Sequence, residues 1–131
     1  MVCTVTASPT PILTADMLEP GMHLNLVGSS IAANREVDSG VVARASVFVD
    51  HEAMTRSAGG EFIAALREGA IDADHIRAEV GAVLLGNVPG RMSEDEVTAF
   101  KSLGMPVEDL FAADHIYREA QRLQVGSWVS F

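Results

Sequence analysis

Residues 22–50, MHLNLVGSSIAANREVDSGVVARASVFVD, contain a strand, a short helix and a second strand in succession. In Met22–Gly28 the large apolar residues recur at every second position, which is the period of a strand. Asn34–Ala45 is predicted to be a short helix, and Ser46–Asp50 is predicted to be the next strand. Strands that are joined by helical connections favour a parallel α/β sheet.

The same alternation continues on both sides of this stretch. Upstream, the β-branched run Val2–Thr6 (VCTVT) predicts a buried strand. Downstream, Glu96–Ser102 predicts a fourth strand, and Val107–Leu123 predicts a last helix that Pro106 opens. Further helical segments are expected at residues 14–18, 52–57, 62–66 and 72–85. Four strands in this arrangement predict half of a doubly wound parallel sheet.

The segment Asp72–Leu85 is predicted to be one helix, with Asp72 as its N-cap. Its apolar residues fall on one helical face: Ile76, Val80, Val83 and Leu84. His75 and Glu79 would lie one turn apart on this helix, a spacing that metal sites also use. Two ligands make a poor site, so we expect no metal.

Length and composition limit what the chain does. Its 131 residues suffice for one domain with one modest core, and a hydrophobic fraction of 48% favours folding over disorder. A group at the start of the last helix is expected in that core: Met105, Val107, Leu110 and Phe111. The net charge of −9 argues against nucleic acid and anionic membranes as partners, because both select basic surfaces.

The cysteine content and the lack of targeting signals indicate the compartment. Cys3 is the one cysteine, so it cannot form an internal disulfide, and it is expected to be a small buried hydrophobic residue. The sequence has no apolar stretch of membrane-spanning length and no signal-peptide pattern. We therefore expect a cytoplasmic protein in a reducing environment.

Several segments, in order and correctly spaced, resemble the ornithine cyclodeaminase/mu-crystallin family. They are VCTVTASPTPIL (2–13), HLNLVGSS (23–30), the pair Arg35-Glu36, AEVGAVLLGNVPGR (78–91) and FKSLGMPVEDLFAADHIYREA (100–120). The resemblance covers almost the whole chain, and FKSLGMPVEDL is its most specific part. Ala82 departs from the family, in which a second glutamate is usual at that position.

The resemblance implies a definite domain plan. Family members have a substrate-binding and dimerising domain, then a Rossmann-type dinucleotide domain, and a last helix that returns to the first domain. This chain would begin near the fourth strand of the Rossmann-type domain, with sheet and helices at 1–104 and the returning helix and tail at 105–131. The Gly-rich GxGxxG loop has no counterpart here, and Gly59-Gly60 is no substitute for it. A partial NAD or NADP site, inactive by itself, is therefore expected.

The resemblance also implies which residues contact the cofactor. They follow three of the predicted strands: Thr4, Val5 and Thr6, then Val27, Gly28 and Ser30, and finally Ser102 and Leu103. Plainer interpretations stay open for each group. Threonine and valine suit any buried strand, Ser29-Ser30 begins a loop, Ser102 caps a turn and Lys101 is a solvated charge.

Ser30 is the candidate catalytic residue and indicates the reaction. Deaminating family members have an aspartate at the matching position, whereas the ketimine reductases similar to mu-crystallin have serine. A carboxylate takes and gives protons near neutral pH, but a lone serine hydroxyl only donates or accepts a hydrogen bond. The resemblance therefore favours reduction of a cyclic ketimine such as pyrroline-2-carboxylate. Ornithine cyclodeamination, an alanine-dehydrogenase-like oxidation and NADPH-dependent small-molecule binding remain alternatives.

The partners expected from this interpretation are a small amino acid or cyclic imino acid and, as in the family, a second subunit of a homodimer. The first strand would also leave one edge of the sheet unpaired. We therefore expect the isolated chain to self-associate.

Overall fold

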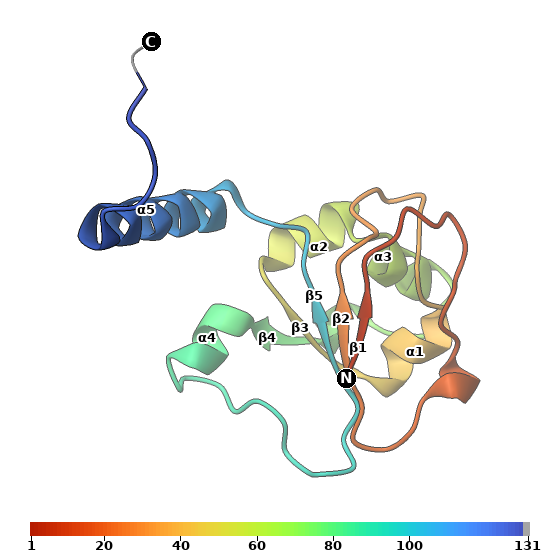
Figure 1. The fold of residues 1–131 in the computed structure, drawn as a ribbon. Coiled ribbons are helices and arrows are strands. Elements are labelled where there is room, and N and C mark those ends of the chain that lie inside the picture. The colour runs from red at the N-terminus through yellow and green to blue at the C-terminus, as the bar shows by residue number, and fades with distance from the viewer. Residues whose placement is uncertain (130–131) are drawn as a thin grey trace.

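The computed structural model describes residues 1–129, which form a five-stranded parallel sheet in the order β1-β2-β5-β3-β4 (Figure 1). The strands are β1 (Val2–Thr4), β2 (His23–Leu26), β3 (Ser46–Val49), β4 (Ile76–Glu79) and β5 (Thr98–Lys101). The α-helices are α1 (Ser39–Arg44), α2 (Glu52–Ala58), α3 (Gly60–Arg67), α4 (Val80–Leu84) and α5 (Pro106–Leu123). Two 3₁₀ turns, η1 (Ala15–Met17) and η2 (Ala73–His75), complete the fold. The predicted α/β class with a parallel sheet is confirmed.

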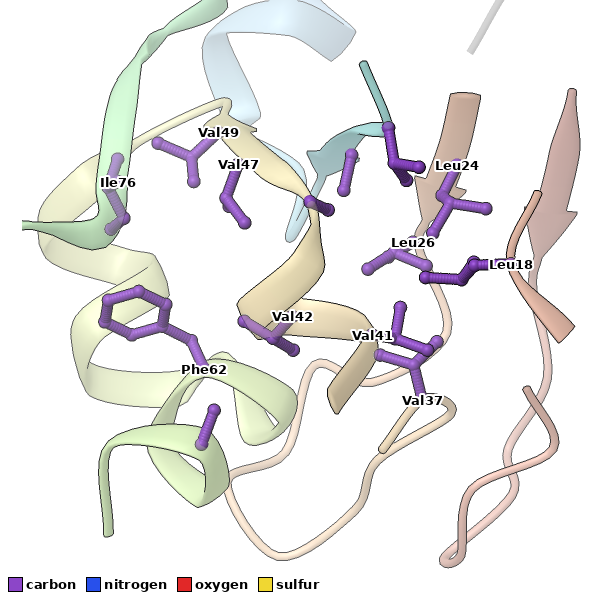
Figure 2. Close-up of a cluster of buried hydrophobic side chains, with 14 residues drawn as sticks. Leu18, Leu24, Leu26, Val37, Val41, Val42, Val47, Val49, Phe62 and Ile76 are labelled. Carbon is purple, nitrogen blue, oxygen red and sulfur yellow. The ribbon is translucent and has the colours of Figure 1, made fainter. Parts of the chain in front are cut away.

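The hydrophobic core lies between the sheet and the helices α1 and α3 (Figure 2). Alternate residues of β2 and β3 point into it, among them Leu24 and Val49, and both are fully buried. Val41 of α1 and Phe62 of α3 face them from the helical side. Burying each of these side chains contributes about 1.5–3 kcal/mol, so this one layer accounts for much of the driving force for folding.

The prediction of one helix at Asp72–Leu85 is wrong. Asp72 does act as a cap, because its carboxylate accepts from the Asp74 amide, but only the short turn η2 follows. Residues Ile76–Glu79 then form β4, which pairs in parallel with β3. Residues 76–79 form a strand and not a helix because their backbone pairs with β3 and the Ile76 side chain packs in the core. Leu84, on the supposed apolar face, is 82% exposed.

The helix expected at Asn34–Ala45 is shorter than predicted and begins at Ser39. Its N-cap is Asp38, whose carboxylate accepts from the Val41 amide at 2.8 Å. The residues before it stay extended because the Glu36 carbonyl accepts from the backbone of the loop at residues 12–13. A long loop therefore connects β2 to α1.

Two predictions of burial are also wrong. Cys3 is exposed, because its side chain points away from the helices that cover the other face of the sheet. At the start of α5, Met105 is only half-buried, and Val107, Leu110 and Phe111 are 47%, 68% and 71% exposed. Helix α5 extends away from the sheet, so its apolar residues find no core in this chain (Figure 1). Within residues 1–129, no helix combines the length and apolarity that crossing a membrane requires.

Candidate functional site

The carboxyl ends of β1, β2, β5 and β3 lie side by side at one edge of the sheet, because these strands are all parallel. The predicted cofactor residues therefore come together from three distant parts of the sequence. In open α/β sheets this edge is where ligands bind. Val5 is 68% exposed and Val27 is 39% exposed, so apolar surface is available there. Thr4, by contrast, is buried and does not present its side chain at the surface.

Glu36 ties the segments after β1 and β2 to each other. Its carboxylate accepts from the Thr6 amide through one oxygen and from the Gly28 amide, at 2.8 Å, through the other. Burial on its own raises the pKa of this carboxyl, but the hydrogen bonds from Thr6 and Gly28 outweigh it and hold the pKa below its usual range. Glu36 is therefore a buried anion that fixes both segments.

Gly28 is required at its position by the closeness of the two loops. A side-chain Cβ there would lie 2.2 Å from the Thr6 carbonyl oxygen and 2.3 Å from a carboxylate oxygen of Glu36. The Thr6 carbonyl belongs to the backbone, and the Glu36 carboxylate is held by the Thr6 and Gly28 amides, so neither yields easily. The role of Gly28 is therefore to let the backbone approach closely, and contact with a cofactor stays a prediction.

Glu61, at the start of α3, holds the loop that carries Ser30. Its carboxylate accepts from the Ser29 hydroxyl at 2.8 Å and from the Glu36 amide at 3.3 Å. Ser29 is buried, but Ser30 is exposed at the surface of this loop. The structure therefore places the candidate catalytic hydroxyl on a loop whose first and last residues are both fixed.

Lys101 forms a buried ion pair with Glu61, with 3.5 Å between the ammonium nitrogen and the carboxylate oxygen. The expectation of a solvated Lys101 is therefore wrong, since its side chain is only 4% exposed. Desolvation lowers the pKa of Lys101, and the nearby Glu61 carboxylate acts in the opposite direction. The ion pair joins the end of β5 to the helix that fixes the Ser30 loop.

Asp50 fixes the segment after β5. One oxygen of its carboxylate accepts from the Leu103 amide at 2.6 Å, the Gly104 amide at 2.7 Å and the Ser102 hydroxyl at 3.2 Å. Sequence reasoning placed Asp50 at the end of a strand and gave it no role. An acidic residue directly after the apolar run SVFV was the available signal, because it comes where a parallel strand reaches the ligand edge.

The supposed metal pair is not a pair in the structure. His75 lies in η2 and its ring nitrogen is 2.8 Å from the Val42 carbonyl oxygen, while Glu79 in β4 accepts from the Glu52 amide. Across residues 1–129 no three acidic, histidine or cysteine side chains are placed to hold a metal ion. The sheet face that α1 and α3 leave uncovered has a groove lined by Phe48, Phe100 and other residues. This groove is separate from the predicted cofactor residues.

The family model described as "Ornithine cyclodeaminase/mu-crystallin family" matches residues 1–124. The chain belongs to the ornithine cyclodeaminase/mu-crystallin family. Among its curated relatives, an alanine dehydrogenase of Archaeoglobus fulgidus is 32% identical. The match covers 98% of this chain and 39% of the length of the dehydrogenase. A Delta(1)-pyrroline-2-carboxylate reductase of Bacillus cereus is 33% identical over 100% of this chain and 40% of its own.

Solved structures of family members match the fold closely. The Thermococcus litoralis Delta(1)-pyrroline-2-carboxylate reductase, solved with NADH and L-proline, superposes with a TM-score of 0.90 at 32% identity. That match covers 98% of this chain and 40% of the reductase. An archaeal alanine dehydrogenase dimer with bound NAD gives a TM-score of 0.85 at 32% identity, over 99% and 41% of the two chains. The chain thus spans about 40% of the length of the relatives it matches.

Proposed function

We propose that this chain forms the nicotinamide side of an NAD or NADP site in an enzyme that reduces cyclic ketimines of the pyrroline-2-carboxylate type. The observation that carries the proposal is the convergence of three predicted segments at one sheet edge: residues 4–6, 27–30 and 102–103. Buried carboxylates fix the backbone of all three segments. A rigid, partly apolar edge of this kind suits a flat aromatic ring with a polar substituent.

The described residues fit the nicotinamide half of a dinucleotide better than its pyrophosphate. Val5 and Val27 offer apolar surface to a ring. No Gly-rich turn joins a strand to a helix N-terminus within residues 1–129, so this part of the chain has no receptor for the pyrophosphate. We therefore propose that turnover needs a further Rossmann half and a substrate domain, which this family's plan provides in one subunit of a homodimer.

Ser30 supports reduction over deamination. When bound, the reduced nicotinamide supplies the hydride for the C=N carbon. Ser30 is exposed, and we infer that its hydroxyl orients the substrate's ring nitrogen or a carboxylate oxygen by a hydrogen bond. Unlike a carboxylate, a serine hydroxyl does not readily accept a proton and return it. Expulsion of ammonia requires such a proton transfer. Ser30 is therefore proposed to orient the substrate, whose imine enters already protonated.

Amino-acid oxidation of the alanine dehydrogenase type is the second candidate. It is favoured by the Archaeoglobus fulgidus relative, whose identity to this chain nearly equals that of the reductases. Both reactions move a hydride between a nicotinamide and a carbon bonded to nitrogen. They differ in whether that nitrogen belongs to a ring, and the chemistry at Ser30 does not separate them.

The binding part of the proposal is tested by titrating the ¹⁵N-labelled chain with NADH and NADPH. We expect NMR shift changes confined to residues 5–6, 27–30 and 102–104, with weak affinity because the pyrophosphate lacks a receptor. Changes confined to the groove at Phe48 and Phe100, or no changes at all, would contradict the proposal.

The reaction is tested with a chimaera. This chain replaces the matching segment of the Bacillus cereus reductase. The rest of the reductase then supplies the other domains. We expect NADH oxidation with Δ1-pyrroline-2-carboxylate and little with pyruvate plus ammonia. The reverse preference would support the alanine dehydrogenase alternative instead.

A further inference from the structure

Two polar side chains that line one cavity in the core have no hydrogen-bond partner among the described residues. They are Lys101 in β5, through its Nζ atom, and Thr55 in α2, through its hydroxyl. Thr55 has no exposed surface, and the Lys101 side chain is only 4% exposed. A buried donor without an acceptor is costly, because it gives up its hydrogen bonds to water on folding. Each of these two groups therefore needs a partner that the side chains around it do not supply.

The ion pair between Lys101 and Glu61 does not meet this need. One Glu61 oxygen lies 3.5 Å from the Lys101 nitrogen, which is longer than the usual length of a charge-assisted hydrogen bond, about 2.7–2.9 Å. The same oxygen already accepts from the Ser29 hydroxyl at 2.8 Å. The Lys101 nitrogen carries N–H groups whether it is charged or neutral, so it needs an acceptor in either state.

The cavity between these groups has a volume of about 10 Å³. All of its lining residues are buried. Apart from Lys101, Thr55 and Glu61 they are apolar core residues, several of which Figure 2 labels: Leu26, Val42, Val47, Phe62 and Ala99. One water molecule requires a cavity of about 10–15 Å³ and typically makes about three hydrogen bonds. The cavity thus matches a single water in volume and in polar partners.

We propose that this cavity binds one water molecule, which joins Lys101 of β5, Thr55 of α2 and Glu61 of α3. The water accepts from the Lys101 nitrogen and donates to a Glu61 oxygen, and the Thr55 hydroxyl can serve it as donor or acceptor. The Lys101 ammonium would repel an inorganic cation at this position, and the Glu61 carboxylate would repel an anion. A neutral molecule that both donates and accepts is therefore the ligand that fits.

The water extends the network that holds the Ser30 loop. Glu61 accepts from the Ser29 hydroxyl and from the Glu36 amide, so whatever fixes Glu61 also fixes this loop. Lys101 and Thr55 thereby act on the loop through Glu61. The water site does not depend on the ligand that binds the carboxyl edge of the sheet, so it can be tested apart from the proposed function.

Thr55→Val tests the site, because valine has nearly the shape and the helix propensity of threonine but no hydroxyl. With a bound water, this variant removes one of the water's partners, and its urea midpoint should lie below that of the wild type. In a dry cavity the unpaired hydroxyl is only a cost, so its removal should raise the midpoint. The direction of the shift therefore distinguishes a hydrated cavity from a dry one.

A double-mutant cycle tests the link between the two side chains. Lys101 and Thr55 make no direct hydrogen bond, so we expect Thr55→Val to lower the midpoint less in a Lys101→Met background than in the wild type. Thr55→Ser keeps the hydroxyl and should show little such coupling. Glu96→Gln is the control background, since Glu96 accepts from Ser46 and Arg77 and shares no partner with Thr55. In that background the effect of Thr55→Val should be unchanged.

A high-resolution crystal structure of the whole chain tests the site without any variant. We expect density for one water within hydrogen-bond distance of Lys101 Nζ, Thr55 Oγ1 and a Glu61 oxygen. No density in the cavity, or density that contacts Lys101 but not Thr55, would overturn the inference. A raised midpoint in Thr55→Val, or equal effects of Thr55→Val with and without Lys101, would also overturn it. Each of these results leaves the proposed function standing.

Discussion

At the scale of single residues, three buried carboxylates organise the candidate site. Glu36, Asp50 and Glu61 each hold a donor from a segment that lies far from them in the sequence. A hydrogen bond to a charged group contributes about 1.5–3 kcal/mol and is directional. Each carboxylate therefore fixes a loop without a large apolar contact area.

The Glu36 carboxylate makes stability depend on pH. Its pKa is lower in the folded chain than in the unfolded one, so the unfolded state binds more protons between the two values. Its contribution is complete above the ordinary glutamate pKa of about 4.3 and is lost as the pH falls below that through the folded value. We expect Glu36→Gln to cost about 1–3 kcal/mol at pH 7 and to weaken the loss of stability on acidification.

Urea denaturation of both proteins between pH 7 and pH 3 measures this effect. Glu94→Gln serves as the control, because Glu94 is exposed and lies outside the carboxylate cluster. Parallel stability curves for wild type and Glu36→Gln would show that Glu36 contributes nothing to the acid sensitivity.

Gly28→Ala should be among the most damaging small substitutions. The new methyl group would overlap the Thr6 carbonyl and the Glu36 carboxylate, and overpacking of this kind costs about 1–3 kcal/mol. Gly81→Ala is the matched control, since no atom lies within 4 Å of its Cβ position and it sits in α4. There alanine should be neutral or stabilising by about 1 kcal/mol. Equal midpoints of urea unfolding for the two variants would contradict the close approach at Gly28.

Ser30→Asp tests how the substrate is handled. In the chimaera described above, an aspartate adds a negative charge beside the substrate carboxylate and a group that takes up protons. We expect kcat/KM for Δ1-pyrroline-2-carboxylate to fall about 10²-fold, because two like charges side by side cost a few kcal/mol. Ser30→Ala should reduce it less, since it removes one hydrogen bond without adding repulsion. A Ser30→Asp variant with wild-type kcat/KM would show that Ser30 does not contact the substrate.

At the scale of elements, the edge strand β1 and the helix α5 are the parts whose surroundings are incomplete. β1 pairs with β2 on one side only, so its other edge presents unpaired backbone groups. Along α5, Leu110, Phe111 and Ile116 are more than half exposed. Exposed apolar surfaces of this size normally pack against other protein, and we propose that the rest of a Rossmann-type sheet and a first domain cover them.

We predict that the isolated chain self-associates through β1. Cys3→Lys places a charge in the middle of the exposed strand, which is a common way to block edge pairing, and it should raise the fraction of monomer. Ala70→Lys adds the same charge at an exposed loop and should not. Sedimentation velocity under reducing conditions measures the distribution. A monomeric wild-type chain at high concentration would disprove the prediction.

At the scale of the whole molecule, one core serves the entire sheet. The cluster includes residues of every strand from β2 to β5 and of both covering helices, and its member Leu24 has no exposed surface. Leu24→Ala should therefore cost about 2–5 kcal/mol and broaden the NMR signals of all elements together. Exposed Leu84→Ala should cost less than 1 kcal/mol. Loss of signals confined to β2 would show that the sheet is not one cooperative unit.

The sequence by itself determined the α/β class and the positions of β1, β2, β3 and β5. Local patterns carry that information, since period-two alternation, β-branched runs and capping residues act over a few positions. It did not determine β4, because the run around Ile76 also satisfies a helical stripe. Only pairing with β3 decides between the two structures, and that partner lies about 30 positions away.

The candidate site divides in the same way. The residues that follow the strands could be named from the sequence, because the resemblance to the family implies them. The carboxylates that hold them could not, because Asp50 meets Leu103 and Glu36 meets Thr6 only after the strands have taken their order in the sheet. Tertiary structure decided that Lys101 is buried and Cys3 exposed, since the face that each side chain takes depends on which side the helices cover.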